Sequence, residues 1–251
     1  MSDLEVKERD AFDGGFAVVD RERLIEEETK VVTPWYKHFI HSIIAPNKMM
    51  EENLLCEPPK GNSIAVVGSI LAILLIAFFQ NMNPQIRQGI YDTLRQKDIA
   101  EDMLGQQYIV SMVVGIIVSF IGILAIALVQ SIVLQIIKAI AKDKCKFAGI
   151  FTVIFLGLFI GLVVQTADYF VANLIDVNYL VFNLGSLINR TALLANNKLM
   201  VLTNFFSLER AFSVAYMMMG YSLIAHKSKK QAAIRIMILQ IIILVFSLIS
   251  A

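Results

Sequence analysis

Five long apolar stretches constrain this chain more than any other feature. The first, 63–80, lies in a run without Asp, Glu, Lys or Arg between Lys60 and Arg87, and the others cover about 107–137, 147–174, 205–225 and 231–249. Eighteen helical residues rise about 27 Å, which approaches the hydrocarbon thickness of a bilayer. Because backbone polar groups in hydrocarbon must be paired within their own segment, we expect an all-α integral membrane protein with five transmembrane helices over 62–251.

The overall composition agrees with this class. Hydrophobic residues make up 57% of the 251 residues, charged residues 17%, and the mean hydropathy is +0.67. Soluble domains average about 45–50% apolar and about 25% charged residues. The net charge is +1, and no arginine-rich patch with interleaved aromatic residues occurs, so no nucleic-acid partner is expected. Cys56 and Cys145 lack the spacing of a zinc or redox pair, so neither a metal nor a cofactor is expected.

The basic residues alternate between connectors. The connectors after the second and fourth stretches are short and basic, whereas 81–106 is acidic on balance and 175–204 holds only two basic residues. Lys and Arg accumulate on the cytoplasmic side of membrane proteins. The sequence therefore predicts a multi-pass protein of the cell membrane with a cytoplasmic N-terminus and an outside C-terminus. The cytoplasmic lysines would be Lys138, Lys142, Lys144, Lys146, Lys227, Lys229 and Lys230.

Two segments precede the first stretch. Residues 1–33 carry ten acidic and five basic side chains, which is typical of a mobile, solvated cytoplasmic tail. Residues 34–61 place apolar side chains at helical spacing, which favours an amphipathic helix in the bilayer interface; packing against the protein's own loops is the alternative. The expected interface anchors are Trp35, Tyr36, Phe39 and Lys37.

The connector 175–204 is largely apolar and is long for a loop in a compact domain. We expect a short interfacial or re-entrant helix there, broken around Asn196 and Asn197, and an outward-facing surface for a ligand or partner.

Three charged residues border the apolar stretches. Asp168 lies near the end of the third stretch, and Glu209 and Arg210 lie in the first turns of the fourth, at a similar predicted depth. A carboxylate and a guanidinium can offset each other's desolvation cost, so an ion pair from Asp168 or Glu209 to Arg210 is expected. The alternatives are interfacial placement near head groups, and a relay for protons or substrate.

Small and amide side chains occur inside the stretches. Gly157 and Gly161 have the spacing that lets helices approach closely, and residues 111–122 offer a similar stripe of Ser and Gly. We interpret both as packing surfaces within the chain first and as oligomer contacts second. The buried-segment glutamines are expected to join helices through hydrogen bonds rather than to line a polar cavity; they are Gln130, Gln135, Gln165 and Gln240.

Catalytic motifs are missing from the sequence. It contains no Walker A pattern, HExxH, GxSxG or pair of carboxylates placed for acid–base chemistry. The sequence thus predicts a protein that is not an enzyme.

The layout is similar to that of bacterial members of the Yip (Ypt-interacting protein) domain family. The segment Trp35–Glu52 (WYKHFIHSIIAPNKMMEE), followed by Pro58-Pro59, resembles the part that precedes the first crossing in that family. Lys142–Phe147 (KDKCKF) resembles the loop before its third helix. Phe206-Ser-Leu, Met219-Gly-Tyr221 and Lys227-Ser-Lys-Lys230 resemble its last helical hairpin. The resemblance covers roughly 35–250 and implies five helices with a cytoplasmic N-terminus.

The resemblance also implies a role. The Asp-Leu-Tyr-Gly-Pro motif of eukaryotic relatives is absent, so binding of a small GTPase is not implied. Some bacterial relatives resemble accessory partners of ABC-type export systems that protect against antimicrobial peptides, and we expect that role here, with ABC transporter subunits as the partner. The alternatives are a stand-alone small transporter or channel, with Asp168 and the glutamines along its path, and a membrane-traffic factor.

Overall fold

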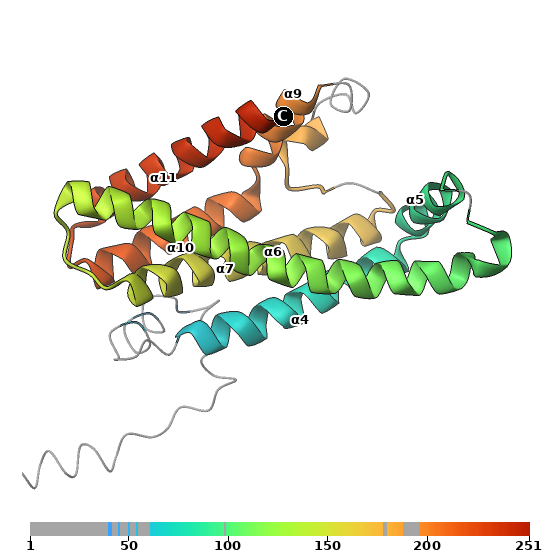
Figure 1. The fold of residues 1–251 in the computed structure, drawn as a ribbon, viewed down its shortest axis with the longest axis horizontal. Helices are drawn as coiled ribbons and strands as arrows, with labels where there is room; N and C mark the ends of the chain where they lie inside the picture. Colours follow the sequence, from blue (N-terminus) through green and yellow to red (C-terminus); the bar gives the residue numbers. More distant parts are fainter. Residues whose placement is uncertain are drawn as a thin grey trace, which may run out of the picture. The chain divides into compact units, whose positions relative to one another are not determined.

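The computed structural model describes residues 61–97, 99–177, 180–187 and 196–251, together with Ile40, His41, Ala45, Met50 and Leu54. The predicted tail, and the anchors Trp35, Tyr36, Lys37 and Phe39, lie outside the described residues. Figure 1 shows the helices, which run in the order α4 (Gly61–Met82), α5 (Pro84–Arg95), η1 (Glu101–Met103), α6 (Leu104–Ala141), α7 (Phe147–Leu174), η2 (Leu184–Leu187), α9 (Asn197–Phe205), α10 (Leu208–Ile224) and α11 (Lys229–Ser250).

Four of these helices are long and apolar enough to cross a membrane, namely α4, α6, α7 and α11. They overlap four of the five predicted stretches, and the all-α membrane class is therefore confirmed. The remaining predicted stretch, the fourth (205–225), is divided: α9 ends at Phe205, and α10 begins at Leu208 after a break. Helix α10 has 17 residues, a length of about 26 Å, and it carries Glu209 in its first turn.

Helix α7 is the centre of the bundle. It contacts α4, α6 and α10, and 61% of its most apolar window is buried, against 6% for α6. The side chains that fill this core include Phe155, Phe159 and Leu156 from α7, Leu134 from α6, and Tyr221 from α10. A helix that is hydrophobic all round is expected at such a central position.

Glycines set the distance between α7 and α10. A Cβ atom on Gly157 would lie 2.5 Å from Met217 Cγ and 3.1 Å from the Ser213 carbonyl oxygen. A Cβ on Gly161 would lie 3.5 Å from Ser213 Cβ. Further along, Gly220 of α10 faces Val153 of α7 in the same way. The two helices therefore run antiparallel at close range, and the packing role predicted for the Gly157–Gly161 spacing is confirmed.

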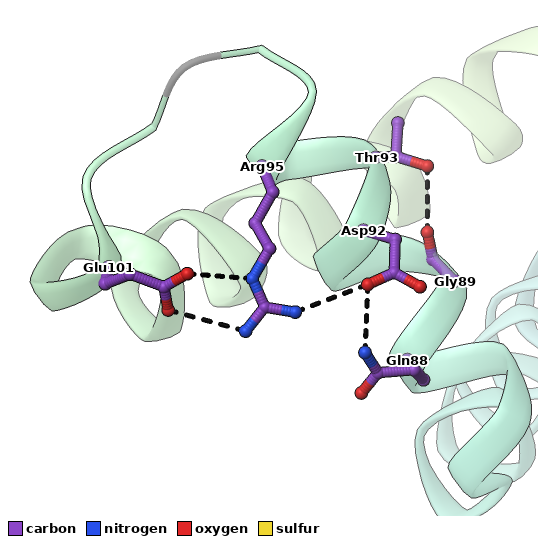
Figure 2. Close-up of polar contacts among 6 residues, drawn as sticks. All are labelled: Gln88, Gly89, Asp92, Thr93, Arg95 and Glu101. Carbon is purple, nitrogen blue, oxygen red and sulfur yellow. Dashed lines mark hydrogen bonds and ion pairs between the residues drawn. The ribbon is translucent and has the colours of Figure 1, made fainter.

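Helix α5 was not predicted; it lies within the predicted connector 81–106. Asn83 caps it, with its side-chain oxygen accepting from Gln85 N and Ile86 N at 3.0 and 3.1 Å, and Pro84 occupies the first helical position. Both features are standard helix-start signals. The exposed ion pair between Arg95 and Glu101 (Nε to Oε1, 2.9 Å) then ties α5 to η1, where α6 begins (Figure 2).

Leucine and tyrosine side chains bury the inner face of α5. Leu94 of α5 forms a small core with Leu104 and Tyr108 of α6, and the rings of Tyr91 and Tyr108 stack with centroids 5.1 Å apart. Since α6 has 38 residues, about 57 Å of helix, it exceeds a bilayer's thickness, and this cluster covers its N-terminal part.

Candidate functional site

The two ends of the bundle are built from one turn motif. Helices α6, α7 and α10 each end with a non-glycine residue in the left-handed region: Lys142 (φ 56°), Asp176 (φ 53°) and His226 (φ 50°). In each case the next residue donates its N–H to a carbonyl five residues earlier, as Asp143 does to Lys138 at 3.1 Å and Lys227 to Ser222 at 3.0 Å. This is the Schellman pattern, which satisfies the orphan carbonyls of a helix end. It gives Asp143 and Lys227 equivalent positions in their two turns.

Asp143 is the polar centre of one end. Its carboxylate has no exposed surface, and Oδ2 accepts from the Tyr221 hydroxyl at 3.0 Å and from Arg235 Nε at 3.2 Å. Lys227 Nζ lies 3.3 Å from Oδ1 as an ion pair. One acidic side chain thus joins the α6–α7 connector to the last turn of α10, to the α10–α11 connector and to the first turns of α11.

The electrostatics of this cluster favour the ionised carboxylate. Burial raises the pKa of Asp143, but the hydrogen bond from Tyr221 and the cations of Lys227 and Arg235 outweigh burial and hold this pKa below its ordinary value. The cluster can therefore act as a charged clamp that holds the two basic connectors together. We call this end of the bundle the Asp143 end.

The predicted cytoplasmic lysines divide between the two connectors at the Asp143 end. Lys138 lies in the last turn of α6, and Lys142, Lys144, Lys229 and Lys230 are exposed. Lys146 stands at the N-cap position of α7. Lys227 of this group forms an ion pair with Asp143, and the structure brings both lysine groups to one end of the bundle, around one carboxylate.

Asp168 organises the opposite end. The residue is 5% exposed, and its carboxylate accepts the backbone N–H groups of Val181 at 2.6 Å and Phe182 at 3.1 Å. Phe182 O in turn accepts from Leu208 N at 2.9 Å, at the start of α10. Asp168 therefore fixes the connector after α7 to the start of α10. Asn83 adds a second tie through its bond to Val177 O at 2.8 Å.

Arg210 has other partners than the predicted Asp168 or Glu209. Within the described part of the chain, no ion pair joins Arg210 to Asp168 or Glu209. Arg210 Nε donates to Gln240 Oε1 of α11 at 3.0 Å, and its guanidinium lies 5.0 Å from the centre of the Phe205 ring. The physical reason is that backbone N–H groups already occupy the Asp168 carboxylate. Arg210 and Gln240 line a cavity of about 570 Å³ with Phe182 and Ser207.

The Asp168 end also shows what the connector 175–204 contains. Residues 184–187 form the short helix η2, and α9 begins after Asn196, whose side chain accepts from Leu199 N at 3.1 Å. The helix start thus coincides with the predicted break at Asn196 and Asn197. Residues 188–195 lie outside the description.

A groove of about 630 Å³ opens between α4, α6 and α7 near the Asp168 end. The stripe of small side chains on α6 forms one wall of this groove, and nothing lies within 4 Å of a Cβ built on Gly115 or Gly122. The packing role predicted for this stripe is therefore wrong for the chain itself, because no helix of the described part covers it. The stripe consists of Ser111, Gly115, Ser119 and Gly122.

The glutamines have unequal surroundings. Gln240 joins α11 to α10 through Arg210, and its Nε2 lies 4.0 Å from Met217 Sδ, which confirms the predicted interhelical use. Gln130 and Gln135 of α6 each have a buried side-chain oxygen without a hydrogen-bond partner among the described residues. Gln165 of α7 lines the groove, and its side chain makes no hydrogen bond to another described residue.

The face of α6 that points away from the groove is also uncovered. Its side chains recur at helical spacing and are each about half exposed. We call this surface the open face of α6, and it comprises Val110, Val113, Val114, Ile117, Ile121 and Leu128.

Sequence reasoning did not single out Asp143, Tyr221 or Arg235 as a cluster. The signal was present, since Asp143 is the lone acidic residue in a connector of four lysines. The predicted topology also placed that connector on the same side as Lys227. Within the described residues, no group of three or more His, Cys, Asp or Glu side chains is placed to hold a metal ion.

The chain was also compared with known proteins. No protein-family model, no curated protein and no solved structure matches it.

Proposed function

We propose that this protein is a non-catalytic, multi-pass membrane protein that serves as an accessory or partner subunit of a membrane transport system. The system that the sequence resemblance favours is an ABC-type exporter that protects against antimicrobial peptides. The observation that carries the proposal is the open face of α6, where the longest helix of the bundle leaves an apolar face uncovered.

The arrangement of the uncovered face supports a protein partner. Lipid chains are as apolar as the side chains of a neighbouring helix, so an exposed apolar face alone does not indicate a protein partner. Helix α6, however, is fixed at both ends, by the Tyr91–Tyr108 stack and by the Asp143 cluster next to its C-terminus. Most side chains of the open face are β-branched valine or isoleucine. Because β-branched side chains have few rotamers to begin with, they lose little rotamer freedom on contact with a partner. A rigid, pre-formed face lowers the entropic cost of association.

The proposal includes five crossings of the cell membrane with a cytoplasmic N-terminus. Helix α10 is the fourth crossing along the chain, in addition to α4, α6, α7 and α11. It starts beside the Asp168-bound connector, and its last turn places Tyr221 in the Asp143 cluster, so it returns along the length of α7. The basic connectors meet at the Asp143 end, which is the end that the distribution of lysines assigns to the cytoplasm. The Asp168 end then faces outside.

A stand-alone transporter or channel receives less support. A relay through Asp168 needs a carboxylate that can exchange protons or ligands, whereas this carboxylate holds two backbone N–H groups. That use is structural, and removal of the carboxylate would release a connector rather than interrupt a path.

The test is co-purification of the tagged protein from its native membrane in mild detergent, with quantification of what accompanies it. The proposal expects the membrane and nucleotide-binding subunits of one ABC transporter in fixed ratio. It also expects Ile117→Trp on the open face to reduce their recovery severalfold. Leu74→Trp is the matched control, because Leu74 of α4 is 45% exposed and lies on another helix.

Recovery of the protein alone, or equal recovery with both variants, would contradict the accessory role. Flux measurements in reconstituted vesicles with Asp168→Asn would then test the transporter alternative.

A further inference from the structure

We propose that the groove between α4, α6 and α7 is a binding site for one hydrocarbon chain of an amphiphile with an uncharged, hydrogen-bonding head group. The site is distinct from the open face of α6 and does not depend on the accessory role. Three observations carry the assignment: the width of the groove, its change in polarity along its length, and an unpaired amide in its wall.

The width decides between a helix and a single chain. The groove runs along α6 from Ser111 to Ile126, which is about 22 Å of helix. Atom centres placed in the groove can occupy about 630 Å³, which over that length is a mean cross-section of roughly 28 Å², or about 6 Å across. With the radius of a water-sized atom, about 1.4 Å, added on each side, the walls stand about 9 Å apart, which is still narrower than the 10–12 Å that a helix with side chains needs. Carbon atoms pack about 4 Å apart, so a single hydrocarbon chain fits this width. The volume also lies within the usual range of small-molecule sites.

The polar side chains of the lining are concentrated at one end. Tyr108, Gln80 and Tyr169 stand near the ends of their helices at the Asp168 end of the bundle, and Ser111 follows one turn after Tyr108. Toward the middle of α6 the walls become mostly apolar, apart from Ser119 and Gln165, with contributions from all three helices. These deeper residues are Ile73, Ile116, Ile123, Ile126 and Leu162. An amphiphile whose head group lies at the bilayer border would match this order, with its head group beside the polar side chains and its hydrocarbon chain along the apolar walls.

The amide of Gln165 supplies the third observation. It lines the groove on α7, nine residues before the end of the helix, and it makes no hydrogen bond to another described residue. An unpaired amide in hydrocarbon is costly, so a ligand that offers a hydroxyl or carbonyl at this depth would be stabilised. None of the described residues that line the groove is Asp, Glu, Lys or Arg, so the lining itself offers no counter-charge to a charged head group.

Each feature of the groove also makes the site testable without loss of the fold. A Cβ on Gly115 or Gly122 meets nothing within 4 Å, so a leucine at either position fills the groove rather than the core. Val114 lies one residue from Gly115 but belongs to the open face, and it is 51% exposed. Val114→Leu is therefore the matched control for Gly115→Leu.

The experiment uses the full-length protein in phosphatidylcholine nanodiscs with a monoacylglycerol that carries a diazirine midway along its chain. After irradiation, peptide mass spectrometry locates the adducts. We expect saturable labelling of residues 115–126 on α6 and around 162–165 on α7, with displacement by unlabelled monopalmitoylglycerol. Gly115→Leu and Gly122→Leu should each reduce labelling at least tenfold, and Val114→Leu should leave it unchanged. Gln165→Leu should weaken displacement three- to tenfold.

Four results would overturn the proposal. The first is undiminished labelling of the two leucine variants while thermal unfolding confirms their fold. The second is labelling spread equally over the open face, which would indicate bulk lipid. Equal labelling by a diazirine-bearing phosphatidylglycerol would contradict the uncharged head group. A cross-link from the groove to a helix of another protein would replace the chain with a protein occupant.

Discussion

Replacement of Asp143 by asparagine should lower the free energy of unfolding of the bundle by about 2 kcal/mol at neutral pH. Loss of one partner from a fully buried ion pair costs about 3–5 kcal/mol. Here the side chains of Arg235 and Lys227 keep 22% and 33% of their surface exposed, so solvent recovers part of that cost. The amide oxygen of asparagine can still accept from Tyr221, which reduces the loss further.

The pH dependence of this effect has a definite sign. The pKa of Asp143 is lowered from its ordinary value of 3.8, so the folded state stabilises the ionised form. That stabilisation is complete above the unfolded-state pKa and is lost as the pH falls through the lower, folded-state pKa. The difference between the wild-type protein and Asp143→Asn should therefore stay constant from pH 8 to 5 and shrink below about pH 4.

The assay is unfolding by sodium dodecyl sulfate from dodecyl maltoside micelles, followed by circular dichroism at several pH values. Asp92→Asn is the control: Asp92 lies in an exposed ion pair with Arg95, at 3.3 Å (Figure 2), and exposed pairs contribute about 0–1 kcal/mol. Equal stability of Asp143→Asn and the wild-type protein, or a difference that grows as the pH falls below 4, would refute the clamp.

Two further predictions concern the helix contacts and the connector. Gly157→Leu should destabilise the bundle by about 2–3 kcal/mol, because the new side chain would overlap Met217 and the backbone of α10. Gly122→Leu is the control and should change the unfolding midpoint little. The same detergent titration measures both variants, and similar midpoints would contradict the α7–α10 packing. Asp168→Ala should leave the N–H groups of Val181 and Phe182 without their acceptor, so hydrogen exchange of these two amides should accelerate at least tenfold; unchanged protection would mean that the connector is held by other contacts.

The parts of the fold that repeat a strong pattern could be predicted from the sequence. The apolar runs located α4, α6, α7 and α11, because length and hydropathy decide whether a helix can lie in hydrocarbon. Helix α5 was missed although Asn83 and Pro84 mark its start, because its polar surface made it resemble an ordinary connector.

The parts that depend on tertiary contacts could not be predicted in the same way. Three helices end on Lys142, Asp176 and His226 in the left-handed conformation, where glycine is the usual signal. Similar depth suggested an ion pair for Asp168, but its carboxylate binds backbone groups 13 and 14 residues later in the chain. The predicted depth of Asp168 in the membrane cannot distinguish an ion pair with an arginine from hydrogen bonds with backbone N–H groups, because either one stabilises a buried carboxylate.

The central position of α7 has a consequence for the order in which the bundle can assemble. The described atoms nearest to Gly157 and Gly161 belong to α10, whose Ser213 is synthesised roughly 50 residues later, about 3–10 s at 5–20 residues per second. During that interval α4 and α6 are already in the membrane, but the face of α7 that carries Gly157 and Gly161 still lacks α10. A nascent chain halted before α10 would therefore present this face to lipid or to insertion chaperones, and quality control could distinguish an unfinished bundle from a finished one by that single helix surface.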